Sequence, residues 1–326
     1  MRTTESGLIL AATDLSNFLA CLHRTALDFA AAHGQLTPPA SAVDAYTRRL
    51  RERGEAHERA YLQCLRDQRL SVVEVPQDQP PASRVEATIA ALKSGADVVY
   101  QAAFAGQGWI GYADILRKVS SEAGRSRLGD FLYEPYDTKL ARETRGGTIL
   151  QLAIYADLLG EVQGVPPERF FVVAPGAPFA IHEYRLVDYA AYVRSVRRNL
   201  LETLAVGPDD LLAGSYPEPN EHCDICRWWE RCEARWRADD HVICCRCDTV
   251  PTRRAQDSGH HDARRRCRTA CSCDVQAIAW QSGNVRSARR AGAGPVRAAR
   301  EWHAGDACPP LSTWRGTLSV ARAFKV

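Results

Sequence analysis

The sequence lacks long hydrophobic runs, because no segment reaches the ~18 consecutive apolar residues that a membrane-spanning helix requires. It also lacks the apolar stretch of a signal peptide, since Glu5 and Asp14 stand near its amino terminus. We therefore expect a cytoplasmic protein with no membrane partner. Thiols stay reduced in that compartment, so the cysteines are expected to be metal ligands or buried thiols rather than disulfides.

The last quarter of the chain lacks the pattern of a folded domain. Residues 243–326 contain only two leucines but fourteen arginines and seven of the 12 cysteines, with no helix or strand periodicity. A segment of this composition cannot bury enough apolar surface to fold. We interpret it as a basic Cys/Arg-rich tail, disordered or translated out of frame from a high-GC gene. The alternative is a Cys/His zinc module that binds nucleic acid.

Charge also divides the chain, although the formal net charge is only +3. Residues 243–326 hold 15 Lys and Arg against 6 Asp and Glu, whereas residues 1–242 hold 27 against 33. Residues 1–242 are therefore acidic. A nucleic-acid groove there must depend on a local basic cluster, for which the candidates are Arg117, Lys118, Lys139, Arg142 and Arg145.

The hydrophobic pattern of residues 1–242 changes between helix and strand periods. A helix capped by Thr13 or Ser16 and ending near Gly34 comes first, and further helices follow over 43–66 and 85–93. The next segments read as an antiparallel meander of three strands, over 97–105, 109–119 and 128–140. A helix over 147–159, strands over 170–174 and 180–186, and a helix capped by Asp188 complete the pattern. The order predicts an α/β fold with an N-terminal helical extension.

The most informative motif is a pair of carboxylates on two of these strands. Gly111-x-x-Asp114 lies in the second strand, and Asp137-x-Lys139 lies at the end of the third. Pairing of the strands would bring Asp114 and Asp137 together, where two carboxylates repel unless a cation lies between them. Oxygen ligands favour Mg or Mn, and Lys139 can orient a water and offset charge on a phosphate. The motif indicates cleavage of phosphodiester bonds.

A cysteine array forms the second motif. Cys223, Cys226 and Cys232 follow a Cys-x2-Cys-x5-Cys spacing on a turn that opens a helix, and Cys21 is the candidate for a fourth thiolate. Four thiolates suit zinc and an iron–sulfur cluster alike. His222 could also replace a missing thiolate.

Two further motifs complete an ordered set: Gly54-x-x-His57 upstream of the strands, and Gln151-x-x-x-Tyr155 on one face of the following helix. In this order the motifs resemble the RecB-like branch of the PD-(D/E)XK nuclease superfamily. The chain is similar to its iron–sulfur members, such as the AddB nuclease domain and the exonuclease of CRISPR adaptation, and to uncharacterised RecB-like nucleases of bacteria. The resemblance covers roughly residues 8–242. It implies a restriction-endonuclease-like core, with a central mixed sheet flanked by helices.

The resemblance also implies roles. Asp114, Asp137, His57 and the Thr138 carbonyl would hold Mg or Mn; Lys139 would position the water, and Gln151 and Tyr155 would align the DNA strand. Cys21, Cys223, Cys226 and Cys232 would hold a [4Fe-4S] cluster, with zinc as the alternative, that ties the first helix to the last. The expected protein is a deoxyribonuclease acting on single-stranded ends in repair or recombination. The rival is a non-catalytic iron–sulfur, DNA-binding scaffold for a helicase or recombination partner.

Resequencing of the gene should reveal a change of reading frame near the codons for residues 240–247. The reason is that the composition changes there to the Arg, Ala, Gly, Cys and Ser of wrong frames in high-GC genes. A single clean frame through to the native stop codon would contradict this interpretation.

Overall fold

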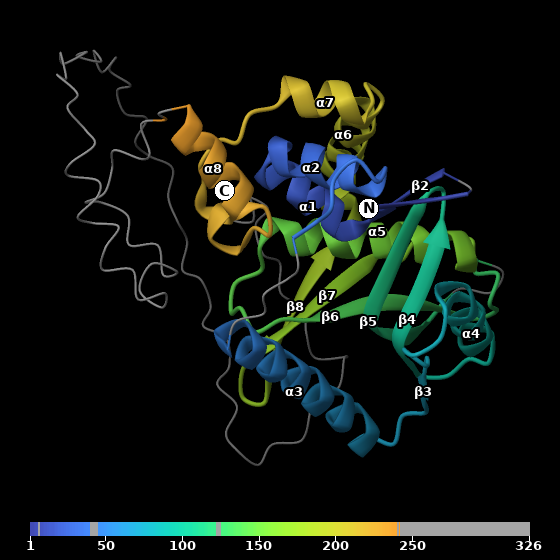
Figure 1. Ribbon diagram of the computed structural model, residues 1–326. Helices are drawn as coiled ribbons and strands as arrows, with labels where there is room; N and C mark the ends of the chain where they lie inside the picture. Colours follow the sequence, from blue (N-terminus) through green and yellow to red (C-terminus); the bar gives the residue numbers. More distant parts are fainter. Residues whose placement is uncertain (6, 40–44, 122–124, 240, 242–326) are drawn as a thin grey trace, which may run out of the picture.

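The computed structural model describes residues 1–5, 7–39, 45–121, 125–239 and 241 (Figure 1). The predicted boundary at residue 242 and the basic tail over 243–326 lie outside the described residues.

The described strands belong to one sheet: β1 (Arg2–Thr4), β2 (Gly7–Ala11), β3 (Val72–Glu74), β4 (Val98–Gly106), β5 (Trp109–Ser120), β6 (Phe131–Thr138), β7 (Arg169–Pro175) and β8 (Phe179–Arg185). The helices are α1 (Ala12–Ala20), α2 (Leu22–Ala32), α3 (Ala45–Asp67), α4 (Pro81–Lys93), α5 (Gly146–Gln163), α6 (Leu186–Leu204), α7 (Pro208–Gly214), the 3-10 helix η1 (Glu221–Ile225) and α8 (Trp229–Ala238).

The sheet is mixed. Its main path runs β1-β2-β5-β6-β7-β8, and β4 joins β5 and carries β3. β4, β5 and β6 form the predicted antiparallel meander, whereas β2 pairs with β5 and β6 pairs with β7 in parallel. The predicted α/β architecture, with a central mixed sheet flanked by helices, is confirmed. Its assignment to the PD-(D/E)XK core stays a prediction.

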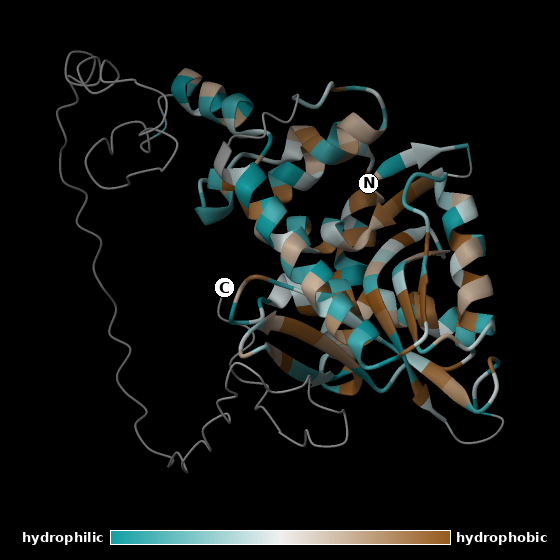
Figure 2. Cartoon of the chain, turned by 90° about the horizontal axis from the view of Figure 1, so that it is seen from below, coloured by the Kyte–Doolittle hydropathy of each residue, from teal (hydrophilic) through white to brown (hydrophobic). Residues whose placement is uncertain are grey.

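Helices cover both faces of the sheet (Figure 1). α5 lies across one face with α1 and α6 packed against it, and its Leu152 joins Leu116 of β5 in the larger core cluster. α3 lies against the other face, where Tyr61 packs with Ile115 in a second cluster. Ile115 and Leu116 thus point to opposite faces, as the two-residue period of a strand requires. Figure 2 shows hydrophobic residues concentrated on the strands between these helices.

The predicted first helix is wrong in one respect, because the chain breaks at Cys21 into α1 and α2. Cys21 has an extended backbone (φ −163°, ψ 115°), and its Sγ accepts a hydrogen bond from the Arg24 N–H at 3.3 Å. The break turns the thiol away from the path of a continuous helix and lets it cap α2. The caps also differ from prediction, since Ala11 precedes α1 and Arg185 precedes α6.

The described helices include none that combines the length and the apolar character needed to cross a bilayer.

Candidate functional site

Asp114 and Asp137 come together where β5 and β6 separate. The strands pair antiparallel as far as Ile115 and Tyr136, so the next register position sets Asp114 opposite Asp137. There the Asp114 Oδ2 accepts hydrogen bonds from the Thr138 N–H at 2.9 Å and from its hydroxyl at 3.1 Å. Thr138 therefore orients one carboxylate beside the other. The predicted role of the Thr138 carbonyl stays a prediction.

Asp137 is completely buried (0% exposed). Its Oδ2 lies 2.5 Å from Lys139 Nζ but accepts no aligned hydrogen bond. Burial, and then the charge of Asp114, raise the pKa of Asp137 to about 7. Burial of Lys139 opposes its own charge, yet Asp137 and Asp114 outweigh burial and raise the pKa of Lys139. The arrangement is one completely buried carboxylate, a second half-buried carboxylate and one ammonium group.

Gln151 and Tyr155 reach this pair from α5. Gln151 Nε2 donates to the Tyr155 hydroxyl at 2.7 Å and lies 3.5 Å from Asp137 Oδ1. The Tyr155 ring lies on the backbone of β5 at Gly111, where an added Cβ would stand 2.7 Å from the ring. Two predicted motifs, Gly111-x-x-Asp114 and Gln151-x-x-x-Tyr155, thus meet in space, and the glycine is what allows the contact.

His57 lies next to the site, on α3. Its Nε2 is 3.0 Å from the Val173 carbonyl, which also accepts the Lys139 N–H at 3.0 Å, and its ring packs on Phe179. A metal-binding histidine commonly donates its other N–H to a backbone carbonyl, and this bond would leave Nδ1 for a ligand. The metal-binding role of His57 stays a prediction.

Sequence reasoning missed Glu58. Burial, and then the charge of Asp114, raise the pKa of Glu58, and its carboxylate accepts a hydrogen bond from Gln101 Nε2. Gln101 occupies the register position opposite Asp114 in β4 and has a φ of 57°. A signal was present, because Glu58 lies four residues after Gly54 and shares its helix face. That face meets the Lys139 segment, since Gly54 lies against Leu140.

The expected basic cluster is only partly available. Arg117 is 9% exposed and lies over the Tyr136 ring, and Lys118 is tied to Asp97 and to the Gly95 carbonyl. These two residues are therefore unsuited to bind nucleic acid. Exposed arginines instead stand on the first half of α3 and before α5: Arg48, Arg49, Arg51, Arg53, Arg142 and Arg145.

The four predicted cysteines line one small cavity, although Cys21 is about two hundred residues from the others in the chain. Their sulfurs receive backbone N–H groups: Arg24 donates to Cys21 at 3.3 Å and Asn220 donates to Cys223 at 3.4 Å. Burial raises the pKa of Cys223 and Cys226, and raises that of Cys232 to about 12. A cation bound among these sulfurs would favour the thiolate forms.

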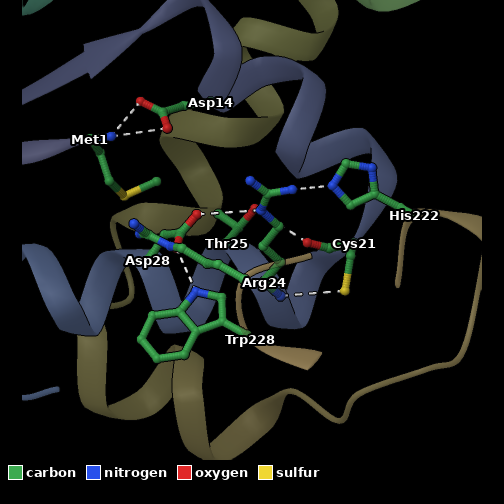
Figure 3. Close-up of polar contacts among 9 residues, drawn as sticks. Met1, Asp14, Cys21, Arg24, Thr25, Asp28, His222 and Trp228 are labelled. Carbon is green, nitrogen blue, oxygen red and sulfur yellow. Dashed lines mark hydrogen bonds and ion pairs between the residues drawn. The ribbon is translucent and has the colours of Figure 1, made fainter. Parts of the chain in front are cut away.

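A polar network next to the cavity holds the carboxyl-terminal segment against α2 (Figure 3). The buried Asp28 accepts hydrogen bonds from Trp228 Nε1 at 2.6 Å and from Arg227 at 2.5 Å. Arg24 contacts His222 Nε2, and its Nε lies 3.6 Å from Asp28 Oδ2. These hydrogen bonds and ion pairs hold the carboxyl-terminal segment on α2 independently of any bond through the cysteines.

Neither site brings three ligands to one ion. Among the residues that the structure describes, no group of three or more His, Cys, Asp or Glu side chains is placed to hold a single metal ion.

Comparison with known protein families found none that matches the chain. Comparison with curated proteins found no match either.

Replacing Gly111 by Ala should destabilise the protein by about 1–3 kcal/mol, because the new methyl group would overpack against the Tyr155 ring. Urea unfolding provides the measurement. The control is Gly54→Ala, where the nearest atom to the new Cβ is 4.0 Å away. That change within α3 should stabilise by up to about 1 kcal/mol. Equal stability of Gly111→Ala and the unchanged protein would refute the ring-on-backbone contact.

Proposed function

We propose that the protein is a metal-dependent nuclease that hydrolyses DNA phosphodiester bonds, acting on single-stranded ends. The observation that carries the proposal is the fully buried Asp137, opposite Asp114 in register and 2.5 Å from Lys139 Nζ. A completely buried carboxylate beside a second, half-buried carboxylate is costly for folding. The pair and its lysine suit a site that receives a hard cation and an anionic substrate.

The donor set fits Mg or Mn. Asp114 and Asp137 would hold the ion, next to the Lys139 ammonium group that lies 2.5 Å from Asp137 Oδ2. A bound cation would offset the burial and the repulsion by Asp114 that together raise the pKa of Asp137. When bound, such an ion supplies Lewis acidity and lowers the pKa of a coordinated water.

The protein groups have separate tasks. Lys139 keeps its proton because the two carboxylates raise its pKa, so it can orient a water and stabilise negative charge on a phosphate. Thr138 fixes the direction of Asp114 through two hydrogen bonds. Gln151 lies between Asp137 and the Tyr155 hydroxyl and sets the position of both. These contacts hold the reacting groups before substrate arrives.

The DNA strand would reach the site past α3. The helix passes the site near Gly54 and Glu58, and Arg48, Arg49, Arg51 and Arg53 lie within about 9 Å along its axis from Gly54 at 1.5 Å per residue. All four side chains are exposed. Exposed arginines bind backbone phosphates without reading sequence, so they suit a nuclease that follows a strand.

A [4Fe-4S] cluster is the proposed occupant of the cysteine cavity, with zinc as the alternative. Four cysteines line the cavity, and Cys223, Cys226 and Cys232 keep the Cys-x2-Cys-x5-Cys spacing of the iron–sulfur nucleases that the sequence resembles. The backbone N–H groups on Cys21 and Cys223 match the hydrogen bonds that tune such clusters.

Asp137→Ala and Lys139→Ala should each lower degradation of a single-stranded oligonucleotide with Mn²⁺ by about 100-fold or more, because each removes a charge from the reacting centre. Gel analysis of the products gives the rates. Asp130→Ala and Lys93→Ala, at exposed positions, serve as matched controls and should leave the rate unchanged. If the Asp137 and Lys139 variants keep the full rate, this site is not catalytic, and the non-catalytic DNA-binding scaffold is the remaining hypothesis.

Changing Arg48, Arg49, Arg51 and Arg53 together to Gln should weaken binding of a fluorescein-labelled single strand in EDTA. The slope of log K against log salt should become shallower by ~0.7 for each phosphate that the variant no longer neutralises. Fluorescence anisotropy at several salt concentrations measures it. The control removes equal charge from exposed positions outside α3, namely Arg2, Arg185, Arg194 and Arg198. An identical slope in both variants would exclude α3 as the DNA-binding element.

A further inference from the structure

Arg24 is a mostly buried cation at the wall of the cysteine cavity. Its side chain is 16% exposed, and its Nε is buried without a hydrogen-bond acceptor. The residue lines the cavity together with Cys21, Cys223, Cys226 and Cys232. A buried guanidinium group with an unsatisfied N–H is unfavourable unless a negative charge lies close to it.

The nearby carboxylate does not supply that charge in full. Asp28 lies 3.6 Å from Arg24 Nε but makes its shorter contacts, 2.5 Å and 2.6 Å, with Arg227 and Trp228. Two arginines thus share one buried carboxylate. The acidic side chains of Glu218 and Asp224 are exposed, so water screens them.

His222 does not supply a negative charge either. Its Nε2 contacts the Arg24 guanidinium, which can only donate, so this nitrogen must be the acceptor. An imidazole nitrogen that accepts from a guanidinium group carries no proton, so His222 adds no charge here. One positive charge at the cavity therefore stays without a matching anion among these groups.

We propose that Arg24 is the counter-cation of a dianionic tetrathiolate metal centre formed by the four cysteines. Four thiolates around either Zn²⁺ or an oxidised [4Fe-4S] core carry a net charge of about −2, so both occupants present the same charge to Arg24. The inference depends on the cofactor part of the proposed function. It assigns to Arg24 a positioning and charge-balancing role without direct ligation.

The test compares Arg24→Gln with Arg227→Gln in the full chain, purified without oxygen. Both changes remove one positive charge bound to Asp28, but the Arg227 side chain is 42% exposed and does not line the cavity. Iron, acid-labile sulfide and zinc are measured first. The rate of metal loss to EDTA should then rise by about 10–100-fold in Arg24→Gln, as for other supporting residues of metal ligands, and by less than about 3-fold in Arg227→Gln.

Two further readouts separate charge from packing. Arg24→Lys keeps the charge and should restore metal retention to near that of the unchanged protein. If the occupant is a cluster, removal of the nearby cation should move its reduction potential to a more negative value in Arg24→Gln, because reduction adds a negative charge. A structural role alone would not produce this shift together with rescue by lysine.

Each outcome has one meaning. If the unchanged protein binds neither zinc nor iron, the proposed cofactor is wrong, and the inference about Arg24 is wrong with it. If the metal is present but Arg24→Gln loses it no faster than Arg227→Gln, only the role of Arg24 is overturned. If Arg24→Gln does not fold, Arg24→Lys decides, because metal loss more than about 10-fold faster in that variant would exclude a role through charge.

Discussion

Repulsion between two carboxylates, one of them completely buried, is the constraint on which the candidate site depends. Asp137 has 0% exposure and stands opposite Asp114 at the end of the β5–β6 ladder. Three groups offset this cost: the Lys139 ammonium, the Thr138 N–H and hydroxyl, and the Gln151 amide. They come from β6, from the segment after it, and from α5. The packing of α5 on the sheet therefore supplies one of the groups that stabilise the buried Asp137.

Irregular backbone gathers at the same place. β2 pairs with β5 at Trp109 and Ile110, and β6 pairs with it from Ile115 onward, so the stretch between is free to receive the Tyr155 ring. On the other side of β5, Gln101 interrupts β4 opposite Asp114 with a φ of 57°, a conformation that costs free energy for a residue other than glycine. The regular pairing of β5 with its neighbouring strands is therefore interrupted next to Asp114, where the side chains of the candidate site lie.

The sequence allowed prediction of what depends on local pattern. Strand period and turn residues located β4, β5 and β6, and their pairing placed Asp114 opposite Asp137. The break at Cys21 could not be predicted, because the apolar period continues across it and the extended backbone of Cys21 lets its thiol cap α2. Charge counting likewise failed at Arg117, whose position in β5 turns it toward the buried Tyr136. The sequence reveals which side chains are charged, but their neighbours in the folded structure decide which of them can contact nucleic acid.

The cysteine cavity and the carboxylate site are connected by one helix. α1 ends immediately before Cys21, and Asn220 Nδ2 donates to the carbonyl of Ala20 at 3.2 Å. The same helix packs closely on α5, where a Cβ added at Gly147 would stand 3.0 Å from Ser16 Oγ. Gly147 lies one helical turn before Gln151, so the position of α1 sets the first turn of the helix that supports Asp137. Contacts that fix the end of α1, such as the Asn220 hydrogen bond, therefore also support the carboxylate site, through packing and without any direct contact.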